Sequence, residues 1–167
     1  AYYRPLTISL YALGYSILGL NVRIYHFINI FVHILTSLSV CYLIYLLFSS
    51  RITALFCGLL FLLHPVQTEA VAYISGLADP LSALFIIWSF IFYIEYLKQG
   101  GRLNYVLVLI SYLLALLAKE NGLILAPILL LYHYAFKVRL KIKQFVPLLI
   151  LTAVYLLFRM NFFRAGL

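Results

Sequence analysis

Long apolar runs separated by short polar breaks make up most of the sequence. Residues 24–48 contain no formally charged side chain, and at about 1.5 Å of rise per residue this run alone can cross a hydrocarbon core of ~30 Å. Five more apolar runs follow, at residues 52–63, 80–97, 103–118, 122–136 and 145–158. They are shorter than the ~20 residues that a span prefers, but flanking basic and aromatic side chains can extend their ends. The pattern predicts an all-α membrane protein, with a bundle of about five to six spans over residues 24–160.

The first apolar stretch, residues 5–20, has a different pattern. It contains two glycines and only a weak polar stripe, and Pro5 suits the first turn of a helix. We expect a shallow helix at the membrane interface, with a true span as the alternative. Residues 1–23 are accordingly predicted to form an extracytoplasmic or interfacial segment, and residues 1–167 a single transmembrane region.

Composition agrees with a membrane protein. Apolar residues make up 66% of the chain and charged residues 10%, against roughly 25% charged in ordinary soluble domains, and the mean hydropathy is +1.11. A soluble fold cannot cover so apolar a core with so few charges, which excludes that class. The net charge of +8 indicates basic loops that orient membrane helices rather than nucleic-acid binding. Cys41 and Cys57 lie inside apolar runs and indicate neither a disulfide framework nor a metal site.

Basic residues predict which helix ends face the cytoplasm. If residues 24–48 run toward the cytoplasm and later runs alternate, seven Lys and Arg side chains fall on the cytoplasmic side and five on the other. The seven are Arg51, Lys98, Arg102, Lys137, Arg139, Lys141 and Lys143. Three of the four acidic residues, Glu69, Asp79 and Glu120, fall on the extracytoplasmic side. Ionisable residues gathered at one membrane face are functional candidates, and we expect them to share a polar cavity there.

Residues 62–80, LLHPVQTEAVAYISGLADP, hold two of the four acidic residues. Pro65 ends the preceding helix, so His64 either marks that end or faces a substrate phosphate or hydroxyl. Asp79 before a proline is typical of a helix N-cap, although a capping carboxylate can also face a cavity.

The cations available to these carboxylates are few. Glu69 can accept a proton, bind a divalent cation, or pair with Arg4 or Lys119. In the segment LLAKENGLIL, the pair Asn121-Gly122 predicts a helix end. Glu120 opposes the helix dipole there, and because adjacent helical residues do not face each other, Lys119 and Glu120 should have different partners.

A polar stripe runs along the first long span. His26, Asn29, His33 and Ser37 recur at helical spacing, which predicts a face that packs inside the bundle through interhelical hydrogen bonds. The two histidines lie about two turns apart, too far for one helix to bind a metal with both. The sequence contains no nucleotide-binding glycine loop, nucleophile motif or zinc signature.

Several segments together resemble a known family. The resemblance runs over most of residues 3–136, and the segments that carry it include YYRPLT, YHFINIFVHIL, LLHPVQTEAVAYISGLADPLSALF and LAKENGLILAPILLLYHY. They are similar to the membrane region of the transmembrane and tetratricopeptide-repeat-containing O-mannosyltransferases and their prokaryotic relatives. The resemblance implies the GT-C fold of glycosyltransferases that use lipid-linked sugars. It implies transfer of a mannose-like sugar from a polyprenyl or dolichyl phosphate to an extracytoplasmic acceptor, either a protein Ser/Thr hydroxyl or a glycan.

The implied reaction needs two kinds of side chain. A lipid-phosphate leaving group needs cations and hydrogen-bond donors nearby. The candidates for this role are Arg4, Lys119, His26 and His64. An acceptor hydroxyl needs a base or an orienting carboxylate. The candidates for catalysis are Glu69, Asp79 and Glu120. A divalent cation is the one cofactor that these carboxylates suggest, and no dedicated metal site is predicted.

The sequence departs from the family pattern at two positions and lacks two of its segments. Leu77 stands where the family usually has Arg, and Gln67 where it often has His. The acidic catalytic motif of the family usually precedes the segment that contains Arg4, and the sequence does not include it. The tetratricopeptide repeats are not included either. We therefore expect a piece of a longer protein, with an N-terminal span and C-terminal repeats elsewhere, or a homologue without activity.

Two other functions stay open. A transporter or flippase-like protein for a lipid phosphate or an ion would use similar charges, but near the membrane midplane rather than at helix ends. A non-catalytic membrane subunit is the other alternative. The predicted partners are a lipid-linked sugar donor, an acceptor protein or glycan, and membrane lipids, without nucleic acid. The predicted location is a prokaryotic cytoplasmic membrane or the endoplasmic reticulum membrane, with the site on the extracytoplasmic or lumenal side.

Overall fold

The computed structural model describes residues 3–165, and every regular element in that part of the chain is helical. The longer helices are α1 (Pro5–Leu18), α2 (Val22–Phe48), α3 (Arg51–Leu63), α5 (Ala78–Gln99), α6 (Arg102–Ala118), α7 (Leu125–Ala135) and α8 (Val146–Ala165). The short ones are η1 (Pro65–Gln67), α4 (Thr68–Ala72), η2 (Ile74–Leu77), η3 (Glu120–Ile124) and η4 (Ile142–Gln144). The prediction of an all-α bundle is confirmed.

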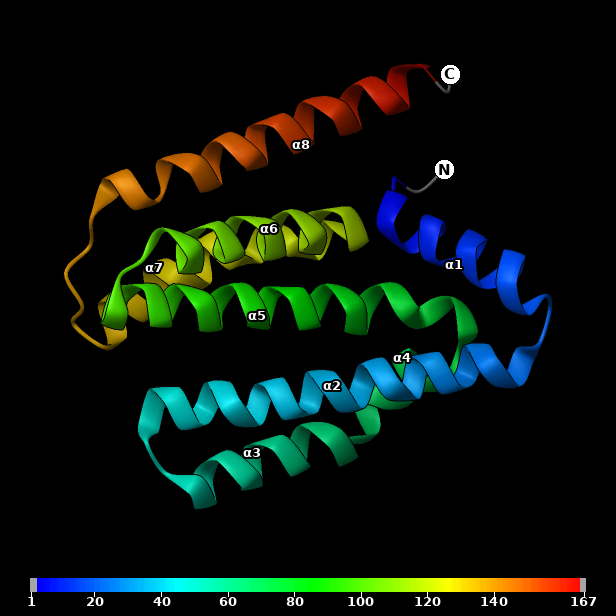
Figure 1. Cartoon of the computed structure of the whole chain (residues 1–167), viewed down its shortest axis with the longest axis horizontal. Helices are drawn as coiled ribbons and strands as arrows, with labels where there is room; N and C mark the ends of the chain where they lie inside the picture. The colour runs from blue at the N-terminus through cyan, green and yellow to red at the C-terminus, as the bar shows by residue number, and fades with distance from the viewer. Residues whose placement is uncertain (1–2, 166–167) are drawn as a thin grey trace.

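The long helices lie side by side and alternate in direction (Figure 1). The most extensive contacts join α5 to α6, α2 to α3 and α2 to α5. One end of the bundle carries α1 and the chain breaks at residues 64–77 and 119–124, and we call it the α1 end (Figure 1). The other end carries the connections at 49–50, 100–101 and 136–145, and we call it the far end.

Local sequence signals set several helix ends. The Ser50 side chain accepts a backbone amide hydrogen bond at the start of α3. This helix ends before His64-Pro65, because proline has no N–H to donate and disfavours a helical residue before it. The chain bends by 49° between α3 and the segment Pro65–Ala72. Gly100 ends α5 at φ 72°, a left-handed conformation that glycine adopts without steric cost.

Two clusters of buried apolar residues form the core. The larger one joins α5, α6, α7 and α8, and its fully buried members include Tyr93, Ile94, Val108, Tyr112, Leu116, Leu125 and Leu129. The smaller one lies nearer the α1 end and contains Val32, Leu77, Leu81, Leu84 and Ala118. Because these side chains come from segments far apart in sequence, the two clusters bring the helices that carry the site residues into contact.

The polar stripe on α2 faces inward as predicted. Asn29, His33 and Ser37 are buried, and His26 is half-buried. Asn29 Nδ2 donates to the carbonyl of Tyr73 at 2.9 Å, and His33 Nε2 lies 3.2 Å from a carbonyl oxygen at the end of α3. The prediction of hydrogen bonds between helices is confirmed for these two side chains. Asn29 attaches α2 to the chain break at 64–77, and His33 attaches it to the end of α3.

Three segments of the described chain are long and apolar enough to cross a membrane: Val22–Phe48, Ile74–Gln99 and Ile142–Phe162. The bent pair of α3 and Pro65–Ala72 is a fourth if it forms one broken span. Helix α7 has 11 residues, about 16 Å at the usual rise, and is shorter than the predicted run 122–136 because that run begins in η3. Length and composition thus support three or four spans, and the crossing of α6 and α7 stays a prediction.

Candidate functional site at the α1 end

Five charged side chains gather at the α1 end of the bundle, and we call them the charged cluster. They are Arg4, Asp79, Lys119, Glu120 and Arg159. They come from the residue before α1, the start of α5, the break between α6 and α7, and α8 (Figure 1). The alternation of apolar runs led us to expect the four predicted members at a common end, and the structure brings them together there.

Lys119 and Asp79 form one ion pair of the cluster, which joins the end of α6 to the start of α5. Lys119 follows α6 with an extended backbone, at φ −160° and ψ 151°, and Glu120 begins η3. This change of backbone direction turns the two neighbouring side chains apart. The expectation that they have different partners is confirmed.

Two arginines hold Glu120. Its Oε1 accepts a hydrogen bond from Arg4 Nη2 at 3.3 Å, and its Oε2 lies 3.6 Å from Arg159 Nη1. Burial by itself raises the pKa of Glu120, but a backbone hydrogen bond and the two arginines outweigh it and hold that pKa below its ordinary value. The carboxylate is therefore ionised at neutral pH and ties the start of α1 to α8.

Close packing at Gly122 positions Glu120. A Cβ added there would lie 2.8 Å from the backbone nitrogen of Leu116 and 2.9 Å from the carbonyl carbon of Ala115. Such distances are shorter than carbon contacts allow, so only glycine lets η3 fold against the last turn of α6. Helix α6 ends at Ala118, three residues before the Asn121-Gly122 pair that predicted a helix end, and the pair itself lies inside η3. The close packing of Gly122 sets the position of the Glu120 carboxylate two residues earlier.

Two hydrogen bonds attach α1 to the rest of this end. The Thr7 hydroxyl donates to the carbonyl of Ala118 at 2.9 Å, and the Tyr11 hydroxyl donates to the carbonyl of Ile74 at 2.6 Å. They join α1 to the end of α6 and to η2, and they keep Arg4 within reach of the cluster. The interfacial placement of this helix stays a prediction.

Asp79 does not cap α5, contrary to the N-cap prediction. The helix begins at Ala78, the N-cap position is Leu77, and no side chain caps it. Asp79 lies in the first turn, where a carboxylate still interacts favourably with the helix dipole. Because η2 leads directly into α5, its preceding turn replaces the cap, and the carboxylate is left to pair with Lys119.

Three predicted site residues lie outside the cluster. Glu69 is exposed on α4, and within residues 3–162 its carboxylate forms no ion pair. Of the three alternatives for Glu69, the pairing with Arg4 or Lys119 is wrong, because each of these binds another carboxylate. His64 is exposed, and its Nδ1 accepts a hydrogen bond from the amide two residues later at 3.1 Å, which fits a role at the helix end. His26 is half-buried near the start of α2.

Arg159 is the cluster member that the sequence analysis did not single out. It lies on α8 and donates a hydrogen bond to the hydroxyl of Tyr155, one turn earlier, at 3.3 Å. The alternation of runs placed it on the same side as Glu120. No motif surrounds it, and a partner 39 positions away in sequence leaves no local signal.

The two carboxylates of the charged cluster pair with cations, and they do not form a metal site with each other. Within residues 3–165 no three His, Cys, Asp or Glu side chains lie close enough together to hold a metal ion. The arrangement is suited instead to an anion, which can interact with Lys119 and the arginines where solvent reaches them.

Comparisons with known proteins identify relatives of the chain. No family model matches it, and no solved structure matches it. Human Protein O-mannosyl-transferase TMTC1 is 34% identical over 141 residues, which is 78% of this chain and 16% of the relative. Human TMTC2 is 34% identical over 155 residues, 87% of this chain and 18% of the relative, and mouse TMTC3 is 34% identical over 140 residues, 78% and 14%. The chain spans about one sixth of the length of these relatives. By sequence it belongs to the TMTC family of protein O-mannosyl-transferases, and it corresponds to one segment of them.

Proposed function

We propose that this chain forms the membrane-embedded part of a glycosyltransferase that transfers mannose from a polyprenyl or dolichyl phosphate to a protein hydroxyl. The reaction takes place at the α1 end, on the extracytoplasmic or lumenal side. The observation that carries the proposal is the charged cluster, in which ion pairs bring three cations and two carboxylates from four separate segments together at one end of a strongly apolar bundle. The relatives are named protein O-mannosyl-transferases, and the chain spans a sixth of them, so the activity is that of the longer protein.

Arg4, Lys119 and Arg159 bind the phosphate of the donor lipid in this proposal. The phosphate gains negative charge as its bond to the sugar breaks, and cations fixed beside it stabilise that charge. The three side chains retain 21%, 17% and 27% of their accessible surface, respectively. A phosphate can therefore reach them without unfolding a helix.

Asp79 and Glu120 act mainly as positioning residues. Each holds a cation of the cluster by an ion pair, and a cation that is already oriented loses less conformational freedom when the phosphate binds. The cluster contains three cations and two carboxylates, so a net positive charge remains for the donor. A direct catalytic role for either carboxylate would require that it first release its cation.

Glu69 is the best placed of the three predicted catalytic residues to act on the acceptor. It is exposed at the same end of the bundle, and no ion pair within residues 3–165 occupies its carboxylate. It takes the proton of the acceptor hydroxyl while the hydroxyl oxygen forms the new bond to the sugar. The old bond from the sugar to the phosphate oxygen breaks, and the lipid phosphate leaves with the electron pair.

The two histidines supply hydrogen bonds to the phosphate. The Nδ1 atom of His64 accepts an amide hydrogen, so the proton of a neutral ring lies on Nε2 and that atom is a donor. His64 is exposed on the chain break after α3. His26 lies on α2, half-buried at the same end.

The test is sugar transfer by the complete protein in proteoliposomes that contain dolichyl-phosphate mannose and a Ser/Thr acceptor. Arg4→Gln and Lys119→Gln should each lower transfer about 100-fold or more, since loss of one charge-stabilising donor costs roughly 10²–10³ in rate. Glu69→Gln should lower it by a similar factor. Lys141→Gln is the matched control, because Lys141 is exposed at the far end and forms no ion pair within residues 3–165. Wild-type transfer by both Arg4→Gln and Lys119→Gln would refute the proposal.

The 49° bend after α3 favours a second candidate, a transporter or flippase for a lipid phosphate, because broken helices form the binding sites of such proteins. Their ionisable groups usually lie near the membrane midplane, whereas the charged cluster lies at helix ends. Movement of a labelled lipid phosphate across the proteoliposome membrane without sugar transfer would favour this function. A protein that inserts but supports neither process would act as a non-catalytic subunit.

A further inference from the structure

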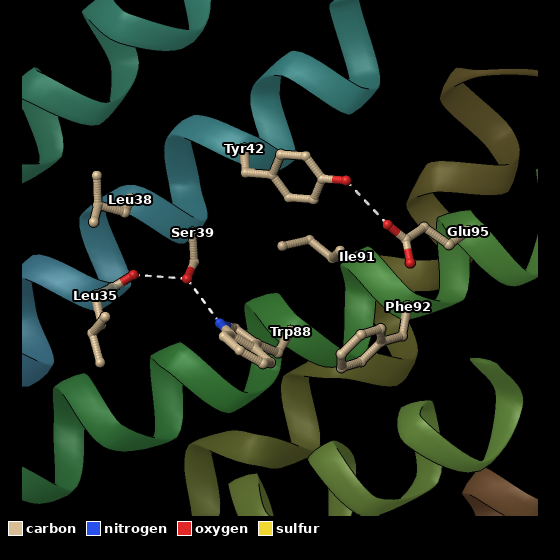
Figure 2. Close-up of a pocket in the computed structure, with 8 residues that line it drawn as sticks. All are labelled: Leu35, Leu38, Ser39, Tyr42, Trp88, Ile91, Phe92 and Glu95. Atoms are coloured by element: carbon tan, nitrogen blue, oxygen red, sulfur yellow. Dashed lines mark hydrogen bonds between the residues drawn. The ribbon is translucent and has the colours of Figure 1, made fainter. Parts of the chain in front are cut away.

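A groove between α2 and α5 lies away from the charged cluster, toward the far end (Figure 2). We call it the α2/α5 groove. Its volume is about 310 Å³, at the lower end of the range for small-molecule sites. Its apolar walls are formed by Leu35, Leu38, Trp88, Ile91 and Phe92.

Two hydrogen-bonded polar pairs line the groove at different positions along α2 and α5 (Figure 2). Trp88 Nε1 donates to Ser39 Oγ at 2.8 Å, and the Tyr42 hydroxyl donates to Glu95 Oε1 at 3.1 Å. Glu95 is the one acidic residue of the chain that does not lie at the α1 end. Within residues 3–165 no ion pair neutralises it. Its hydrogen-bond donor is the neutral hydroxyl of Tyr42, and a carboxylate that lies on a membrane helix without an ion pair is a functional candidate.

The groove is polar near the helix ends and apolar toward the middle of the bundle. Glu95 precedes the last residue of α5, Gln99, by four positions, and Tyr42 precedes the last residue of α2, Phe48, by six. They lie about 6 and 9 Å from those ends, near the boundary between headgroups and hydrocarbon. Trp88 lies about 10 Å deeper than Glu95. A site with this gradient fits an amphiphile whose polar part faces the membrane surface.

Lys98 places a cation beside this carboxylate. It follows Glu95 by three positions on α5, so the two side chains are neighbours on the helix surface. Its Nζ donates to the carbonyl of Leu46 at 3.2 Å, and since an ammonium group has three N–H donors, two remain. Arg51 lines a second hollow beside the groove, and Tyr42 lines both. The outer end of the groove thus presents a carboxylate together with cations.

We propose that the α2/α5 groove binds a phospholipid whose headgroup carries a primary amine. The ammonium group donates to Glu95, the phosphate accepts from Lys98, and one acyl chain follows the apolar walls as far as Trp88. A primary ammonium has N–H groups that can donate to a carboxylate, whereas the quaternary ammonium of a choline lipid has none. An anionic lipid without an amine can pair with Lys98 but offers no N–H group to Glu95. A headgroup that carries both a phosphate and a primary amine matches both side chains, and this selects the aminophospholipid.

Trp88 makes the proposal measurable, because its ring forms a wall of the groove and this sequence holds no other tryptophan. The complete protein is reconstituted in bilayers with a small fraction of brominated phosphatidylethanolamine or, separately, brominated phosphatidylcholine. Bromine atoms on the acyl chain quench tryptophan fluorescence on contact, and Trp88→Phe supplies the background to subtract. We expect the affinity of the groove for the ethanolamine lipid to be about threefold higher than for the choline lipid, because a partly exposed ion pair contributes a modest binding free energy. Glu95→Gln should abolish this preference, and Glu69→Gln, the matched change at the α1 end, should leave it intact.

Each other outcome overturns the proposal. Equal quenching by the two lipids in the wild-type protein would mean that the headgroup is not recognised, and so would a preference that survives in Glu95→Gln. Absence of quenching by either lipid would mean that another protein surface, such as a membrane helix, covers the groove. The measurement needs no sugar transfer, so its result is independent of the function proposed for the α1 end.

Discussion

Gly122→Ala should disturb the charged cluster although Gly122 carries no charge. The added Cβ would meet two backbone atoms of α6 at 2.8 and 2.9 Å, where ordinary contact begins at 3.4 Å. A helix backbone cannot rotate aside as a side chain can, so η3 must move away by at least about half an ångström. Overpacking of this kind costs about 1–3 kcal/mol, roughly a 5- to 150-fold change in the folding equilibrium. Glu120 moves with η3, which weakens its contacts with Arg4 and Arg159.

The assay combines stability with transfer by the complete protein. Resistance to heating in mild detergent is followed by size-exclusion chromatography, and the KM for the proposed lipid-phosphate donor is measured on the folded fraction. Gly100→Ala is the matched control, since its Cβ would meet open space while its φ of 72° and ψ of −153° make alanine unfavourable, by about 1–3 kcal/mol. Both variants should be less stable than the wild type, but only Gly122→Ala should raise the donor KM. Unchanged stability and KM in Gly122→Ala would refute the argument that this contact positions the site.

Three further predictions test other parts of the structure. Tyr93→Phe removes the hydroxyl that lies 2.7 Å from the buried Nε2 of His133. This change should lower the free energy of unfolding by about 1–3 kcal/mol, and heat resistance equal to that of the wild type would contradict the prediction. The pKa of Glu120 is depressed in the folded protein, so its stabilisation is present above the ordinary value of 4.5 and is lost as pH falls below it. Heat resistance measured from about pH 6 to about pH 3 should show that loss in the wild type and a smaller one in Glu120→Gln, and equal losses would be inconsistent with the ion pairs. In a protein without its native cysteines, a single cysteine replaces either Glu69 or Gly100. The two cysteines should react with an impermeant maleimide from opposite sides of sealed vesicles. Reaction of both from the same side would disprove the alternation of helices.

The apolar runs predict the long helices because burial in lipid or core needs only a sustained lack of charge. The runs 24–48 and 80–97 coincide with α2 and α5 to within two residues at each end. The run 122–136 does not, because its first residues form η3. That turn depends on the contact of Gly122 with α6, and hydropathy carries no information about such a contact.

The candidate site was predictable as a set of residues but not as a set of pairs. The turn at Lys119 and Glu120 is local, so their divergence could be inferred from neighbouring residues. The pairing of Lys119 with Asp79 joins positions 40 residues apart, and only the packing of α5 on α6 creates it. The predicted pairing of Glu69 failed for the same reason, because helix packing brings other carboxylates closer to both of its expected partners.

The two ends of the bundle are held together by different means. At the far end, α2 connects to α3 and α5 connects to α6 through two residues each, at 49–50 and 100–101, so the covalent chain fixes the spacing of these helices. At the α1 end, the start of α1, the start of α5, the end of α6 and α8 are distant in sequence, and ion pairs join them. Ion pairs can exchange partners, whereas short loops cannot. We therefore expect an anion that competes for Lys119 or Arg4, such as the phosphate of a membrane lipid, to weaken the ion pairs of the α1 end while the hydrogen bonds of Thr7 and Tyr11 still hold α1. The short connections of the far end should not change.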